Sequence, residues 1–191
     1  MTALLLTLMF ALAPVQADTA VNRAEQIRLT EEIRSLSRRQ IWQGVEDKYR
    51  SLEALDSDLG FEVYLSGAHS ARALGLMTEA YERLQGAAKL QPTKEVLDWL
   101  WYIDTNYGWV ELNGSGNRAI VLEAEVSPMD PAQRTAIEKS ADMAFVQGAF
   151  TGVLPVGVYW FCGERFEVVA GERVSVLAAP KGDTRLGRYR R

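Results

Sequence analysis

The sequence predicts an α+β protein in which N-terminal antiparallel helical hairpins pack on a small C-terminal antiparallel β domain with one inserted helix. Apolar residues recur at helical spacing up to about residue 108, whereas apolar and polar residues alternate as in strands from residue 109. Residues 95–109, where the pattern changes, contain three of the five tryptophans. We expect this segment to be the buried interface between a helical domain (residues 18–108) and a small β domain (residues 109–179).

The first 17 residues have the features of a secretory signal peptide. Residues 3–13 are apolar but too few to span a bilayer, and Val15 and Ala17 place small residues at the usual cleavage spacing. Because no Lys or Arg precedes the apolar run, an uncleaved hydrophobic anchor or a first helix is the alternative. We expect a periplasmic or secreted protein that begins near Asp18 and has no membrane span after signal removal.

The composition argues against several classes of function. A net charge of -4 does not favour nucleic-acid binding, which depends on neutralising phosphates. The single cysteine, Cys162, excludes an intramolecular disulfide and is interpreted as a buried small hydrophobe. Four arginines lie in the last seven residues, so we predict a basic flexible tail over residues 180–191, with docking to an anionic surface as the alternative.

Four apolar stripes at helical spacing predict four helices between residues 18 and 92. A turn over residues 37–40 separates the first two, Gly75 separates the third from the fourth, and Pro92 closes the fourth. The stripe residues are Leu29, Ile33 and Leu36; Ile41, Val45, Tyr49 and Leu52; Phe61, Tyr64, Leu65, Ala68 and Ala71; and Met77, Ala80, Tyr81, Leu84, Ala87 and Ala88.

The last two of these helices have small residues where they must approach each other closely. The turn, packing and closing positions are Gly75, Ala80, Leu84, Ala87 and Pro92. Their spacing resembles a tetratricopeptide repeat. In the preceding segment, the places of Ala80, Leu84 and Ala87 are taken by Val45, Tyr49 and Leu52. The resemblance covers about residues 26–94 and implies two hairpins with a concave face for a ligand. Plain antiparallel hairpins are the alternative.

Within residues 95–109 the sequence predicts a fifth helix that is apolar on most sides. A repeat stack normally needs about three units, and only two are predicted here. We therefore expect this helix to be buried on most sides, between the repeats and the β domain. Its apolar residues are Val96, Leu97, Trp99, Leu100, Trp101, Tyr102 and Ile103.

Two strands and a helix are predicted next. A strand beginning at Trp109 leads into a turn-rich loop over residues 113–117 that suits a hairpin, and residues 120–126 alternate as a half-exposed strand. Asp130 and Pro131 then predict the N-terminus of a helix that extends to residue 147 and ends at Gly148. The inward residues are Ile120, Leu122, Ala124 and Val126 in the strand, and Ile137, Ala141, Ala144 and Phe145 in the helix.

A hairpin is the strongest signal near the C-terminus. Residues 158–162 and 165–169 flank Gly163 and Glu164, which suit a two-residue type II′ turn, and residues 174–177 would add a third strand to a meander. The pattern of Leu154, Pro155, Gly157 and Tyr159, followed by Phe166, Val168 and Gly171, resembles the strand entry of carboxypeptidase-regulatory-like and PEGA-type domains. This resemblance implies a small β-sandwich, or a sheet packed on a helix.

No catalytic or metal-binding constellation is apparent in the sequence. His69 is the only histidine and Cys162 the only cysteine, so neither a zinc site nor a base-activated nucleophile is expected, and no cofactor is implied. Glu123 and Glu125 lie on one face of a predicted strand, and paired carboxylates can hydrolyse glycosides. A hydrolase is therefore the lesser alternative to a protein that is not an enzyme.

The leading hypothesis is an exported interaction or assembly module that binds a protein or peptide partner in the cell envelope. Its partner-binding residues would be Tyr64, Ala68, His69 and Arg72 on the concave face. The alternative is a glycan- or peptidoglycan-binding module in which exposed aromatic rings stack on sugars. Its residues would be Trp99, Trp101, Tyr107 and Trp109.

Overall fold

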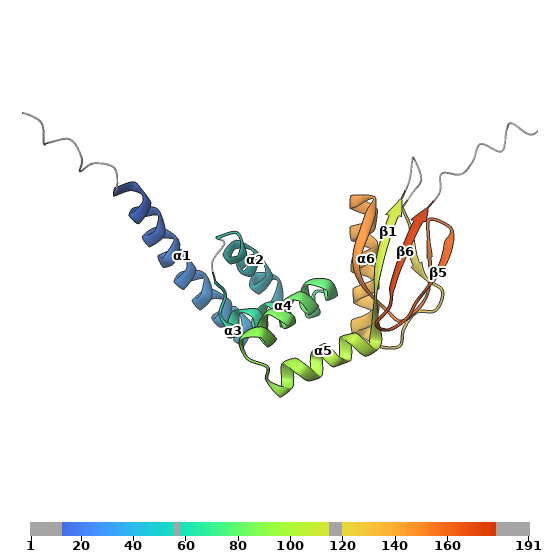
Figure 1. The fold of residues 1–191 in the computed structure, drawn as a ribbon, viewed down its shortest axis with the longest axis horizontal. Helices are drawn as coiled ribbons and strands as arrows, with labels where there is room; N and C mark the ends of the chain where they lie inside the picture. Colours follow the sequence, from blue (N-terminus) through green and yellow to red (C-terminus); the bar gives the residue numbers. More distant parts are fainter. Residues whose placement is uncertain (1–12, 56–57, 115–119, 179–191) are drawn as a thin grey trace, which may run out of the picture.

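The computed structural model describes residues 13–55, 58–114 and 120–178, and has a helical half followed along its long axis by a β half (Figure 1). The helical half contains α1 (Ala13–Arg38), α2 (Trp42–Glu53), α3 (Phe61–Ala73), α4 (Met77–Leu90) and α5 (Lys94–Asn106). The β half contains β1 (Tyr107–Gly114), β2 (Leu122–Ala124), α6 (Pro131–Gln147), β3 (Ala149–Pro155), β4 (Gly157–Phe161), β5 (Glu164–Val168) and β6 (Arg173–Ala178). The predicted α+β class is confirmed.

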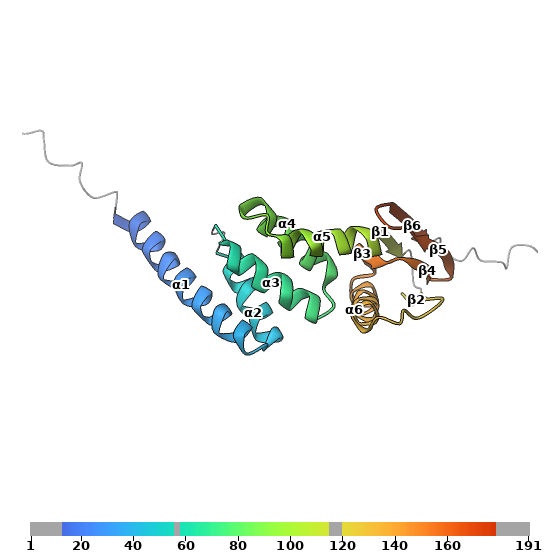
Figure 2. The same cartoon turned by 90° about the horizontal axis from the view of Figure 1, so that it is seen from below.

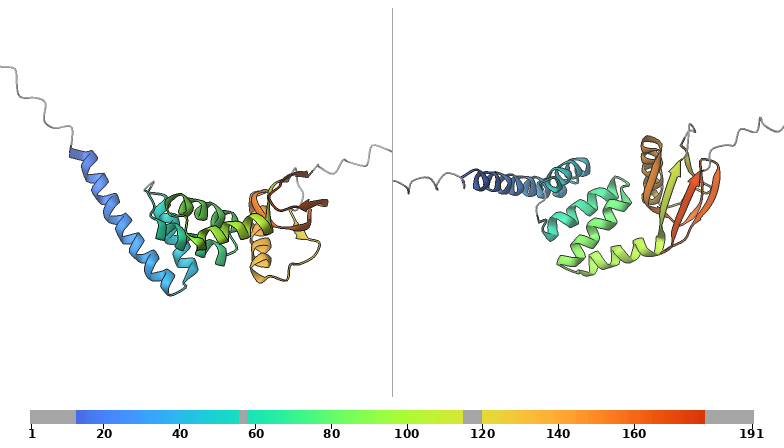
Figure 3. Two further views of the ribbon diagram at one scale, coloured as in Figure 1. Left: turned by 60° about the horizontal axis from the view of Figure 1, so that its bottom comes forward. Right: turned by 45° about the horizontal axis from the view of Figure 1, so that its top comes forward.

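Successive helices pack against one another in sequence order, as Figure 2 shows for α1 to α4. The N-terminal end of α1 extends away from the other helices (Figure 3). The helix starts at Ala13, inside the predicted signal peptide, while residues 1–12 and the predicted tail over residues 180–191 lie outside the described residues. Among the helices of the described ranges, none combines the length and apolarity needed to cross a membrane.

Two of the turns between helices contain a residue whose backbone has a positive φ. Gln40, at φ 55°, reverses the chain between α1 and α2 without a glycine or proline. Gly75, at φ 78°, does so between α3 and α4, and a Cβ there would lie 2.7 Å from the carbonyl oxygen of Thr135 in α6. Glycine is therefore required at position 75 both for its backbone conformation and for contact with the β half.

Aromatic rings lie on helical glycines where the helices cross. A Cβ added to Gly67 of α3 would come within 2.4 Å of the Tyr49 ring of α2, and one added to Gly86 of α4 within 2.6 Å of the Tyr64 ring of α3. Close packing between consecutive helices thus depends on tyrosine and glycine as well as on the predicted alanines Ala80 and Ala87, which are fully buried.

A buried ion pair joins α2, α3 and α4. The Glu46 carboxylate, 2% exposed, accepts hydrogen bonds from both terminal nitrogens of Arg83 (2.5 and 2.9 Å) and from the Ser70 hydroxyl (3.1 Å). Arg83 also donates to the carbonyl oxygen of Gly67 at 2.8 Å, and its guanidinium lies 3.9 Å from the centroid of the Tyr49 ring. These contacts satisfy both buried charges within the helical core.

The β half consists of two three-stranded sheets whose inner faces share one core. In the first sheet, β1 pairs antiparallel with β3 and parallel with β6; in the second, β4 pairs antiparallel with β2 and β5. The helix α6 contacts β2 and β3 and closes the side where these edge strands lie (Figures 1 and 2). The core residues include Val110, Leu112, Ile137, Ala144, Phe150, Leu154, Tyr159, Phe161 and Phe166.

The ends of α6 follow the prediction. The Asp130 carboxylate accepts a hydrogen bond from the backbone N–H of Ala132 (2.9 Å), Pro131 occupies the first turn, and Gly148 ends the helix at φ 77°. The β4–β5 hairpin is also present, but its turn residues are Cys162 and Gly163. Both have positive φ (50° and 86°), which is the type I′ combination, so the prediction of a type II′ turn one residue later is wrong.

Two predicted pairings in the β half are wrong. The strands β1 and β2 do not form a hairpin because they belong to different sheets, and β6 joins β1 in parallel instead of extending the β4–β5 meander. The strand β3 was not predicted at all. Two residues predicted to point inward are exposed. Val126 lies beyond the short β2 and is 80% exposed, and the side chain of Phe145 in α6 is 68% exposed.

The fifth helix is less buried than predicted but fixes the two halves to each other. Val96 and Ile103 are buried, whereas Leu97 is exposed and Trp101 is 68% exposed, because α5 packs along one side only. The helix ends at Asn106 and β1 begins at the next residue, without a loop. The change from helix to strand therefore lies two residues before the predicted boundary at residue 109.

Two hydrogen bonds add to this connection. The Thr78 hydroxyl of α4 accepts a bond from the backbone N–H of Val153 in β3 (3.0 Å), and the Tyr102 hydroxyl of α5 donates to Asp130 at the start of α6 (2.9 Å).

A candidate binding cleft between the helical half and α6

A cavity of about 370 Å³, here called the cleft, lies between the helical half and the N-terminus of α6. A second cavity of about 220 Å³, the inner pocket, adjoins it, and Arg72 and Trp99 belong to both. The cleft is lined by Trp42 of α2, His69 and Arg72 of α3, Trp99 of α5, and Pro131 and Ala132 of α6. The inner pocket is completed by Met77, Ala80, Tyr102 and Ile103.

The His69 imidazole lies between two indole rings. Its centroid is 6.3 Å from that of Trp42, with the rings nearly parallel at 21°, and 4.7 Å from that of Trp99, which it meets edge to face. Its Nε2 lies 3.5 Å from the Glu95 carboxylate. Burial lowers the pKa of His69, the neighbouring Arg72 lowers it further, and Glu95 opposes both, with a net shift below the ordinary value.

The pKa of this single histidine provides a direct test of the cleft geometry. We expect an NMR titration to give His69 a pKa below 6.5. Arg72→Gln should raise the pKa because it removes a nearby positive charge, whereas Glu95→Gln should lower it because it removes a negative one. Equal pKa values in the wild type and both variants would contradict this arrangement.

Arg72 is the cation of the cleft. Its guanidinium carbon lies 4.4 Å from the centroid of the Trp99 ring, within the range of a cation–π contact. In residues 13–55, 58–114 and 120–178 no ion pair involves Arg72. The Trp99 indole therefore has contacts with His69 and Arg72 and faces a cleft that contains an arginine without a carboxylate partner in this part of the chain.

The structure brings two of the four predicted partner-binding residues to the cleft. His69 and Arg72 line it, whereas Ala68 is fully buried and Tyr64 packs on Gly86, so these two support the helices behind the surface. Binding of a partner by this group stays a prediction. Trp42 also lines the cleft but was not predicted to do so, although its spacing from Val45 places it on the apolar side of α2.

The four aromatic residues of the glycan hypothesis do not form one row. Trp99 lies in the cleft, Tyr107 is buried, and Trp101 is exposed on another side of α5. Trp109 packs edge to face on Tyr81 at 6.2 Å, with Arg173 5.5 Å from its centroid.

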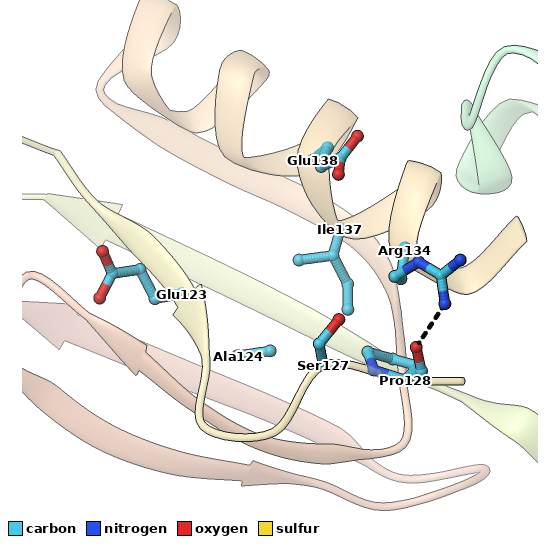
Figure 4. Close-up of a pocket in the computed structure, with 7 residues that line it drawn as sticks. All are labelled: Glu123, Ala124, Ser127, Pro128, Arg134, Ile137 and Glu138. Atoms are coloured by element: carbon cyan, nitrogen blue, oxygen red, sulfur yellow. Dashed lines mark hydrogen bonds between the residues drawn. The ribbon is translucent and has the colours of Figure 1, made fainter. Parts of the chain in front are cut away.

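Glu123 and Glu125 are directed to different surroundings. Glu123 lines a separate cavity of about 310 Å³ between β2 and α6, while Glu125 forms an exposed ion pair with Arg165 at 2.9 Å. The other carboxylate at this cavity is Glu138, and in Figure 4 Ile137 lies between it and Glu123. Arg134 donates to the carbonyl oxygens of Pro128 (3.0 Å) and Met129 (2.7 Å), so it orders the chain before α6.

Comparisons of the chain with protein-family models, curated proteins and solved structures find no match.

Proposed function

We propose that this protein is a non-enzymatic interaction module of the cell envelope that binds a peptide or protein partner in the cleft. The observation that carries the proposal is the Trp99 indole, which contacts His69 and Arg72 at the wall of a 370 Å³ cavity. Partly buried aromatic and arginine side chains contribute most to binding at protein interfaces. Export to the envelope rests on the signal-like pattern of residues 1–17.

The helical half supports this function if its hairpins are tetratricopeptide-like, as their spacing suggests. Ala80 and Ala87 are fully buried at the predicted close-packing positions, and Gly75 turns the chain between α3 and α4. Stacked helical hairpins of this kind form concave surfaces that hold extended ligands. In the same proposal the two small sheets correspond to a β-sandwich of the PEGA-like kind, and α6 on this β half supplies one wall of the cleft.

Photo-crosslinking from inside the cleft tests the proposal. Benzoylphenylalanine in place of Ala73, an exposed residue that lines the cleft, should form a reproducible crosslink to one partner in cells of the source organism. Trp99→Ala should reduce that crosslink about tenfold, because it removes an interface tryptophan. Mass spectrometry of the crosslinked band measures both results.

A second tryptophan of α5 provides the matched control for Trp99→Ala. Trp101→Ala removes an equally large ring outside the cleft and should leave the crosslink unchanged. Benzoylphenylalanine in place of the exposed Lys89 should not capture the same partner. Equal loss in both tryptophan variants, or the same proteins captured from both positions, would contradict the proposed role of the cleft.

A further inference from the structure

We infer that the ligand of the cleft is the free C-terminus of a partner chain that ends in an apolar residue. This inference rests on the proposed function and specifies what the cleft recognises. It combines two features that meet at Arg72 and Trp99: a cation that can bind a carboxylate, and an apolar pocket beside it.

Arg72 is suited to a carboxylate ligand. Its guanidinium carbon lies over the Trp99 ring, and the N–H groups of an arginine can bind both oxygens of a carboxylate. Two acids of this region, Glu95 and Asp130, already have partners. Glu95 lies 3.5 Å from His69, and Asp130 accepts hydrogen bonds from Tyr102 and from the N-terminal turn of α6.

The N-terminus of α6 adds little attraction for an anion. Its N-cap residue, Asp130, carries a negative charge and already accepts the hydrogen bond of the backbone N–H of Ala132. Among the described residues that line the cleft, Arg72 is the cation left for a ligand.

The inner pocket is suited to an apolar side chain. Its volume is about 220 Å³, and its walls include the buried side chains of Met77, Ala80 and Ile103. Because Arg72 and Trp99 line both cavities, a group in the inner pocket and a carboxylate on Arg72 would be close neighbours.

This closeness favours a chain end over an internal acidic residue. In a C-terminal residue the carboxylate and the side chain branch from the same Cα atom. In an extended internal segment, consecutive side chains point to opposite faces, so an acidic side chain and its apolar neighbour would not enter adjoining cavities together. Capture of a terminal carboxylate is also a recurring mode of peptide recognition.

Four fluorescein-labelled peptides test the inference by fluorescence anisotropy with the full chain. All share a Gly-Ser linker and end in leucine with a free carboxylate, leucine amide, lysine with a free carboxylate, or an internal leucine–aspartate pair with a terminal amide. We expect the first to bind at least about tenfold more tightly than the other three. The two amidated peptides lack a terminal carboxylate for Arg72, and the lysine peptide lacks an apolar side chain for the inner pocket; each of these contacts is worth about that much. Arg72→Gln should reduce the difference between free acid and amide to about twofold or less.

Arg34→Gln, which removes an exposed arginine of α1, is the matched control and should keep the full difference. Circular dichroism and thermal unfolding confirm that each variant is folded. Equal affinity for acid and amide, preference for the internal aspartate, no binding at millimolar peptide, or an unchanged preference in Arg72→Gln would each overturn the inference. The proposed function is judged separately by the Ala73 crosslink, which can persist when the C-terminal preference fails.

Discussion

Glu46→Ala should lower the free energy of unfolding by about 3–5 kcal/mol, because it leaves the buried guanidinium of Arg83 without its carboxylate. Arg83 is itself almost fully buried and bridges three helices, so water cannot replace the lost partner without opening the core. Urea unfolding followed by circular dichroism measures the change.

Arg50→Ala provides a control on the same carboxylate. Arg50 also donates to Glu46, at 2.8 Å, but its side chain is 59% exposed, so its removal should cost at most about 1 kcal/mol. If both substitutions cost the same, the buried pair is not the connection that stabilises the helical half.

The Glu46 carboxylate also predicts a pH dependence. Burial would raise its pKa, but hydrogen bonds from Arg83 and Arg50 outweigh burial and hold the pKa below the ordinary 4.5. The stability contributed by ionised Glu46 is then complete above pH 4.5 and is lost as the pH falls through the lower folded-state value. The difference in stability between the wild type and Glu46→Gln should therefore shrink on acidification below that pH.

Gly108→Ser should cost about 3 kcal/mol or more, because a Cβ at this position would lie 2.3 Å from the backbone carbonyl oxygen of Val169. The contact is with main chain, which cannot rotate away as a side chain can. Hydrogen bonds from Gly171 to Tyr107 and from Trp109 to Glu172 hold these two segments together. Relief of the clash would separate the start of β1 from the segment before β6, and thermal unfolding should show a lower midpoint.

Gly60→Ser is the matched control. No atom lies within 4 Å of a Cβ at Gly60, which is the N-cap of α3 at φ -79°. Serine is a preferred N-cap residue, so this substitution should leave stability unchanged or raise it slightly. A similar loss in both serine variants would show that the close approach at Gly108 is not the cause.

Local signals in the sequence predicted most of the helices correctly. Gly75 and Pro92 marked the limits of α4, and Asp130, Pro131 and Gly148 marked those of α6, because caps and turns act over a few residues. The β4–β5 hairpin was found for the same reason. Its turn was assigned one residue late because Cys162, which has a side chain, takes the positive φ that the prediction reserved for glycine.

Pairings between distant segments could not be predicted in this way. The parallel pairing of β1 with β6 joins Trp109 to Arg173, and no local pattern specifies it. The pair of Glu46 and Arg83 spans 37 residues, and no local pattern marks either side chain as buried. The cleft was only half predicted for the same reason: His69 and Arg72 were found, but the wall formed by α6 comes from the other half of the chain.

The loopless passage from α5 into β1 has a kinetic consequence for any ligand. Both walls of the cleft are attached to this continuous backbone and are joined again by the bonds of Thr78 to Val153 and of Tyr102 to Asp130. Because these bonds and the uninterrupted backbone hold the two walls in one arrangement, we expect the cleft to keep its shape when a ligand binds. Association should then be a single step at the ordinary docking rates of about 10⁵–10⁷ M⁻¹s⁻¹, and the residence time of the ligand should determine its affinity.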